Sequence, residues 1–156
     1  MADELLPTNL AAERVVLGCL IEDQTLWGEV KATCLTAADF SLADHRRIFA
    51  AIETMLARHV PVDYVSCAEF LGNAQPDYVL LASLIEGIAI CPSHVRYHAG
   101  LVKSKARLRE LAKLGQWLFE SAVATGANPD SIRGETLHRL DRLSGMTDSA
   151  LSEVVL

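Results

Sequence analysis

The chain of 156 residues has few aromatic side chains, 6% of its composition, and no Cys-x-x-Cys pair. Its four cysteines are scattered, which is typical of small buried thiols in a reducing compartment. No stretch approaches the roughly 18 apolar residues that a membrane-spanning helix needs. The first residues lack the cations and the apolar run of a secretory signal peptide. We therefore expect a soluble, cytoplasmic protein without membrane contacts.

The sequence also lacks the signature of a nucleotide-hydrolysing motor. A phosphate-binding loop needs a glycine directly before its lysine. None of the four lysines, Lys31, Lys103, Lys105 and Lys113, follows a glycine. No Ser or Cys stands with a His and Asp at a spacing diagnostic of nucleophilic catalysis. We expect a non-catalytic chain that binds no cofactor.

Strand signals are equally sparse, because no stretch sustains the period-two alternation of a half-buried strand. Apolar residues make up 51% of the chain, with alanine and leucine dominant, and both favour helix. The capping pairs Thr36–Asp39 and Ser41–Asp44 mark expected helix starts. The prediction is an all-α fold, with helices at 10–21, 26–32, 42–58, 63–72, 77–86, 94–125 and 130–144.

The helix predicted at 94–125 is about 45 Å long, which is more than one small domain can cover. We divide the chain into a compact head at 1–91, a helical hairpin at 92–145 and a tail at 146–156. An unbroken heptad spacing runs along the long helix and requires a covering surface. The return helix is expected to cover its distal half, and the head or a second copy of the chain the rest. The candidate interface residues are Tyr97, Leu101, Leu108, Leu111 and Leu118.

Charge is distributed unevenly along the chain. Residues 1–93 carry 5 Lys and Arg against 13 Asp and Glu, whereas residues 94–113 carry 6 against 1. An acidic body with one basic helix predicts weak or no direct DNA binding. The cations Lys103, Lys105, Arg107 and Arg109 form either a solvated face or a surface that meets acidic groups of a second copy.

Histidine and cysteine residues offer the other candidate chemistry. Cys91, His94 and His98 have a spacing that would suit a zinc ligand set, although a fourth protein ligand is missing and a structural role is favoured. No metal site is therefore our main prediction. His45 lies on the apolar face of its predicted helix, where a hydrogen-bonded core histidine is more common than a catalytic one.

Several fragments in order resemble the N-terminal domain of bacterial replicative DNA helicases of the DnaB type. The opening Pro-Thr-Asn-Leu-Ala-Ala-Glu-Arg-Val-Val-Leu-Gly-Cys-Leu, Asp-Phe followed by His-Arg-Arg-Ile-Phe, and Pro-Val-Asp at 61–63 carry the resemblance, which covers about residues 7–125. Ser41 departs from it, because the family commonly has an aromatic residue there. The motif residues expected to be structural are Pro7, Glu13, Leu17, Gly18, Phe40, His45, Arg46 and Phe49.

The resemblance implies a non-catalytic collar domain that supports ring oligomerisation and primase docking in DNA replication. It implies self-association as a dimer, a trimer of dimers in the ring, contact with the primase C-terminal domain, and contact with a helicase loader. The tail would begin a linker to the family's ATPase domain, which does not follow in this sequence. Two alternatives remain open: a stand-alone helicase regulator or antagonist on a mobile element, and a small metal-dependent protein that uses Cys91, His94 and His98.

Overall fold

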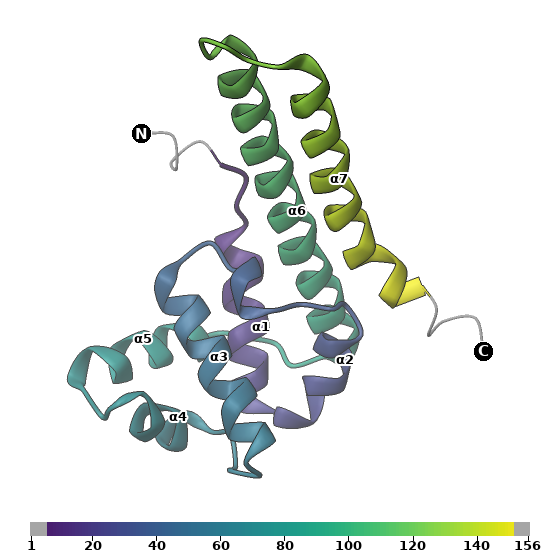
Figure 1. Cartoon of the computed structure of the whole chain (residues 1–156). Helices are drawn as coiled ribbons and strands as arrows, with labels where there is room; N and C mark the ends of the chain where they lie inside the picture. Colours follow the sequence, from purple (N-terminus) through teal and green to yellow (C-terminus); the bar gives the residue numbers. More distant parts are fainter. Residues whose placement is uncertain (1–5, 152–156) are drawn as a thin grey trace. The chain divides into compact units, whose positions relative to one another are not determined.

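The computed structural model describes residues 6–151, with side chains over residues 6–144. The regular structure in this part of the chain is entirely helical, without strands, which confirms the all-α prediction (Figure 1). These residues form two compact units. The head unit contains residues 8–106, and the hairpin unit contains residues 6–7 and 107–151. The head unit extends into the long helix because Val95, Ala99 and Val102 are buried in its core.

The helices follow the expected order, with short 3-10 turns at Gln24–Leu26 (η2) and Ala37–Asp39 (η3). No helix within residues 6–151 is both long and apolar enough to cross a membrane. The α-helices are α1 (Leu10–Glu22), α2 (Trp27–Lys31), α3 (Ala43–Ala57), α4 (Tyr64–Leu71), α5 (Gln75–Ile85), α6 (Pro92–Val123) and α7 (Pro129–Leu151).

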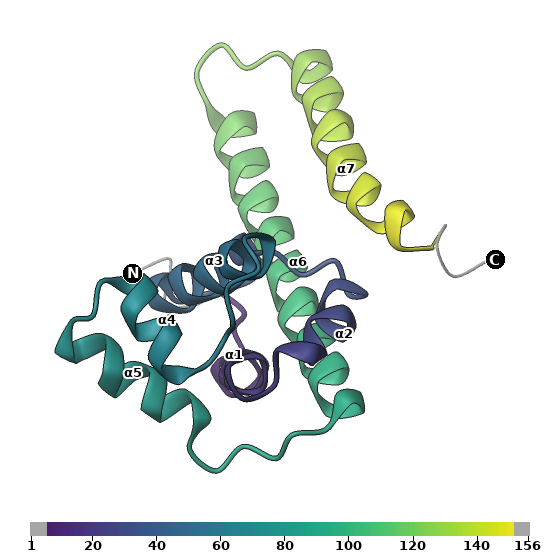
Figure 2. The same cartoon turned by 90° about the horizontal axis from the view of Figure 1, so that it is seen from below.

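Helix α1 is the centre of the head unit and packs against α3, α4 and α5 (Figure 2). Asn9 caps its start, with the backbone N–H of Ala12 donating to Asn9 Oδ1 at 3.0 Å. A Cβ at Gly18 would overlap the backbone oxygen of Leu84 and the side chain of Ile88. Glycine is therefore required at this position for the close approach of α1 and α5.

The start of α3 differs from the prediction. Ser41 and Asp44 do not form a capping box, and the residue before the helix is Leu42, without a side-chain cap. The Ser41 hydroxyl instead donates to Glu13 on α1 at 2.6 Å. A bond to a residue distant in sequence thus replaces the local one. The predicted box of Thr36 with Asp39 is confirmed at η3.

Helices α4 and α5 are short and lie side by side at one end of the head unit. Asp63 caps α4 through the backbone N–H of Ser66 at 2.8 Å, and Gly72 ends it with φ of 118°, both as predicted. Arg14 on α1 satisfies carbonyl oxygens at the end of α5, donating to those of Ser83 and Glu86. This guanidinium fixes the last turn of α5 to α1.

In the hairpin unit, α6 and α7 run antiparallel (Figure 1). Gly126, with φ of 78°, lies in the turn, and Asn128 Oδ1 accepts from the backbone N–H of Ser131 at 3.0 Å at the start of α7. The Arg139 guanidinium lies 4.0 Å from the centroid of the Trp117 ring and joins the two helices. Helix α7 continues to Leu151. The predicted end at residue 144 is therefore wrong.

Candidate functional site

A buried polar network joins α1 to the start of α3. Glu13 Oε1 accepts hydrogen bonds from the backbone N–H of Ser41 at 2.8 Å and from its hydroxyl at 2.6 Å. Glu13 Oε2 lies 2.7 Å from His45 Nδ1. The Glu13 side chain is 1% exposed. His45 is thus a hydrogen-bonded core residue, as predicted. The Ser41 hydroxyl is a donor that a phenylalanine side chain would lack, whereas the backbone N–H donor does not depend on the side chain.

The environment of Glu13 sets its charge. Burial acts to raise the pKa of this carboxyl, but hydrogen bonds from His45 and Ser41 outweigh burial and lower its pKa below the ordinary value. Glu13 is therefore ionised at neutral pH, with all its strong acceptors used inside the head unit. This arrangement holds α1 and the start of α3 together.

The other motif residues of the head unit also have structural positions. Arg46 Nη1 donates to the carbonyl oxygens of Phe40 and Ser41, each at 2.9 Å. The rings of Phe40 and Phe49 are 4.9 Å apart, and both side chains are fully buried together with Leu17. The Asp-Phe and His-Arg-Arg-Ile-Phe motifs thus build the α1–α3 core rather than a binding site.

The metal alternative is not supported by the positions of its residues. No group of three or more His, Cys, Asp or Glu side chains in the described part of the chain is arranged to hold a metal ion. Cys91 caps the first turn of α6 through its carbonyl oxygen, and its Sγ lies 3.2 Å from Ser93 Oγ. His94 is exposed, whereas the ring of His98 packs edge-on against Tyr97. The alternative ligand set of Cys91, His94 and His98 is therefore not supported in the described part of the chain.

Two of the four cations proposed as a pairing surface are used within the chain. Lys103, 5% exposed, places its Nζ 2.9 Å from Asp39 Oδ2 inside the head unit. Arg109 Nη1 donates to the carbonyl oxygen of Pro7 at 2.9 Å inside the hairpin unit. Neither expectation for these cations, a solvated face or a surface that meets a second copy, holds for Lys103 and Arg109. The Arg109 contact also gives Pro7 a role as a backbone acceptor. Among the described residues, no comparable ion pair or hydrogen bond is found for the side chains of Lys105 and Arg107.

Most of the predicted heptad residues are open to solvent in the single chain. Tyr97 is 64% exposed, Leu108 44%, Leu111 49% and Leu118 37%, whereas Leu101 is partly buried against the head core. The expectation that α7 would cover Leu111 and Leu118 is wrong. The less exposed positions of the distal half are instead Leu114, Trp117 and Ser121 on α6 and Ile132, Thr136, Arg139 and Leu143 on α7.

Sequence analysis missed two exposed apolar residues on α6, Phe119 at 69% and Val123 at 66%. At 100° per residue they extend the predicted stripe on one side, at angles about 20° and 60° around the helix axis from Leu108. A helical-wheel count that allowed a stripe wider than two positions per heptad would have included them. We define the hairpin face as Leu108, Leu111, Leu118, Phe119 and Val123.

Comparisons with known proteins show which family the chain resembles. A model of the DnaB-like helicase N terminal domain matches residues 5–104. The replicative DNA helicase DnaB of Pasteurella multocida is 32% identical over 123 residues, covering 76% of this chain and 26% of that protein. A probable replicative DNA helicase of Trieres chinensis is 29% identical over 139 residues, covering 85% and 30%. The chain thus spans about a quarter to a third of the length of these curated relatives.

A solved structure gives the same result at the level of the fold. The crystal structure of the N-terminal domain of DnaB helicase from Mycobacterium tuberculosis superposes with a TM-score of 0.79 at 25% identity, covering 88% of this chain and 99% of that one. Glu13, Ser41 and His45 of the buried network lie within residues 5–104, which the family model matches. The chain belongs to the family of DnaB-like helicase N-terminal domains.

Proposed function

We propose that this chain is the non-catalytic collar domain of a replicative DNA helicase ring, in which copies pair through the hairpin face. Three observations support the proposal. The sequence carries no phosphate-binding loop, the family match covers a helicase N-terminal domain, and the hairpin unit leaves large apolar side chains exposed. The last of these carries the proposal.

The hairpin face has the composition of a protein–protein interface. Its five large side chains are between 37% and 69% exposed. Between residues 108 and 123 they lie, with Ala112, Gly115 and Ala122, in an arc of about 140° on α6 that contains no charged residue. Arg107 and Gln116 flank this arc. Contiguous apolar surface of this kind marks interaction sites, and small residues within it allow close helix approach.

A second copy of the chain is the occupant that fits this face most simply. In two-fold pairing one self-complementary patch serves both partners. Full burial of one large aliphatic or aromatic side chain contributes about 2 kcal/mol, so five half-exposed residues per copy offer a substantial gain. Tyr97, which the same heptad register predicts to be an interface residue, is also exposed.

The remaining partners follow from the family. We propose that paired copies assemble further, as a trimer of dimers, and that the collar receives the primase C-terminal domain and a helicase loader. The acidic head sequence argues against tight DNA binding. At physiological salt we expect at most the non-specific range of about 10⁻⁴ to 10⁻⁶ M for DNA.

A charge-introducing variant tests pairing. Leu108→Lys with Leu111→Lys places two cations on the hairpin face, and these exposed positions tolerate lysine without unfolding the chain. We expect sedimentation velocity to show a monomer whose helical circular dichroism matches that of the unmodified dimer. Val65→Lys, at a 58% exposed residue of α4, is the control and should remain dimeric. A double variant that still dimerises would show that pairing uses another surface.

A further inference from the structure

The hairpin unit has no buried core between residues 110 and 144, a range whose side chains the structure describes. Every side chain in this range is exposed or half-buried. The head core, by contrast, contains fully buried side chains such as Leu17 on α1 and Ile52 on α3. We define the α6–α7 stripe as the half-buried positions of this range. They are Leu114, Trp117 and Ser121 on α6 and Ile132, Thr136, Arg139 and Leu143 on α7.

The two helices of the hairpin differ in what else holds them. The first part of α6 belongs to the head core, in which Val95, Ala99 and Val102 are buried. Helix α7 lies wholly in the hairpin unit. Helix α6 therefore keeps its support in the head when α7 is removed, whereas α7 depends on its contact with the hairpin.

Polar side chains make up a large part of the α7 side of the stripe. The Arg139 guanidinium lies over the Trp117 ring at 4.0 Å, but the arginine side chain is 41% exposed, and a cation–π contact contributes little at an exposed site. Arg139 also pairs with Glu135, and the Thr136 hydroxyl donates to the carbonyl oxygen of Ile132. These last two bonds lie within α7 and do not hold it to α6.

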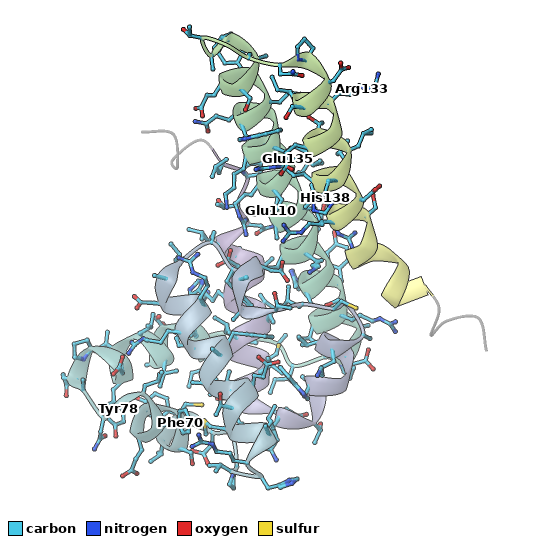
Figure 3. The ribbon with its side chains drawn as sticks, viewed as in Figure 1. Phe70, Tyr78, Glu110, Arg133, Glu135 and His138 are labelled. Carbon is cyan, nitrogen blue, oxygen red and sulfur yellow. The ribbon has the colours of Figure 1, made fainter. Side chains whose placement is uncertain are left out.

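The sequence of α7 gives it little stability of its own. Gly134 and Gly145 lie inside the helix, where glycine is less favourable than alanine. Exposed polar side chains, among them Arg133, Glu135 and His138, occupy other sides of α7 (Figure 3). Because a helix in a protein owes most of its stability to the packing of one face, α7 depends on its half-buried stripe.

We propose that α7 detaches from α6 as one cooperative unit while the head unit stays folded, so that the hairpin opens and closes. Local openings of this kind occur where few apolar side chains are buried, and they precede global unfolding. The closed hairpin is the main state, and the open state is a minor one in which Leu114 and Trp117 of α6 become accessible. The hairpin face contains no residue of α7, and this proposal does not depend on pairing.

Native-state hydrogen exchange of the full ¹⁵N-labelled chain, followed by nuclear magnetic resonance, measures the opening. We expect the amides of residues 136–143 to share one protection factor, at least about 100-fold below that of residues 16–20 in α1. Low concentrations of urea should accelerate these α7 amides with one common slope, because a single event exposes them all.

Two variants with the same substitution on the same helix locate the contact. Leu143→Ala shortens a half-buried side chain of the stripe, and Leu137→Ala shortens one that is 56% exposed. We expect Leu143→Ala to accelerate exchange of residues 136–143 about tenfold. We expect Leu137→Ala to change it less than about twofold, and both variants to leave the α1 amides unchanged. Both residues lie outside the hairpin face, and sedimentation measures pairing separately.

Four results would overturn the proposal. In the first, the α7 amides are as protected as those of α1. In the second, protection falls gradually toward the end of α7 without a common value, which is fraying rather than detachment. In the third, the two alanine variants have equal effects. In the fourth, Leu143→Ala accelerates the α1 amides as much as those of α7, which would show that α7 opens only when the whole chain unfolds.

Discussion

The head unit and the hairpin unit differ in how many of their large apolar side chains are buried. In the head, large side chains such as Leu17, Ile52 and Leu81 have no exposed surface. In the hairpin, residues of similar size, including Phe119 and Val123, are about two thirds exposed. The head buries most of its large apolar side chains in one core and leaves a few, such as Val65 and Tyr97, exposed. The hairpin leaves most of the large apolar side chains on its part of α6 uncovered by its own chain. The difference indicates a folded scaffold that presents an association surface.

Charged pairs show the same contrast. Lys103 and Asp39 are both buried in the head, and their atoms lie 2.9 Å apart. The pairs Lys113–Glu110 and Arg139–Glu135 of the hairpin are exposed helical neighbours, three and four residues apart. Figure 3 shows Glu110 on α6 and Glu135 on α7. Buried pairs are costly to break, whereas exposed ones contribute about 0 to 1 kcal/mol.

The largest expected effect is on the head core. Leu17→Ala removes a fully buried side chain and should lower the free energy of unfolding by about 3 to 5 kcal/mol, through lost burial and a residual cavity. Leu111→Ala, at a half-exposed position of the hairpin, should cost below about 1 kcal/mol in the monomer. Urea denaturation at protein concentrations at which sedimentation shows only monomer separates folding from pairing. Equal losses would contradict the contrast between the units.

The second effect concerns the buried ion pair. Lys103→Met leaves the Asp39 carboxylate buried beside an apolar side chain, and we expect a loss of about 3 kcal/mol. Lys113→Met in the exposed pair should change stability by less than about 0.5 kcal/mol. Thermal melts of both variants at one protein concentration measure the difference. A Lys103 variant as stable as the Lys113 variant would show that the ion pair is not important for the head.

The third effect depends on pH. The folded-state pKa of Glu13 lies below its ordinary value of 4.5, so its stabilising contribution is present above pH 4.5 and is lost as pH falls through the lower folded-state pKa. Glu13→Gln should cost about 2 kcal/mol at pH 7, and the difference from the unmodified chain should shrink below pH 4.5. Denaturant titrations across this range test the sign. A difference that grows with acidification would contradict it.

Much of the fold follows from local sequence signals. Asn9, Asp63 and Gly72 end or begin helices as predicted, because caps and left-handed terminators act within three or four residues. The heptad spacing likewise predicted a long α6 with an apolar stripe. Such signals need no knowledge of distant parts of the chain.

Two of the failures involve partners far away in sequence. Ser41 bonds to Glu13, 28 positions away, rather than to Asp44, and Lys103 pairs with Asp39, 64 positions away. Neither contact can be read from spacing, because it depends on how the helices pack. The exposure of Leu111 and Leu118, although α7 continues to Leu151, also depends on how the helices pack. The exposed apolar stripe on α6 was therefore predicted only in part, and its use as an interface stays a prediction.

The central claim is that the hairpin face meets its counterpart on a second copy. Isotope-filtered nuclear Overhauser spectra of a mixture of ¹³C-methyl-labelled and unlabelled chains measure this directly. We predict intermolecular contacts from the methyl groups of Leu108, Leu111, Leu118 and Val123, and none from Leu137, a 56% exposed residue of α7 outside the hairpin face. Intermolecular contacts from Leu137 but none from the hairpin face would contradict the account.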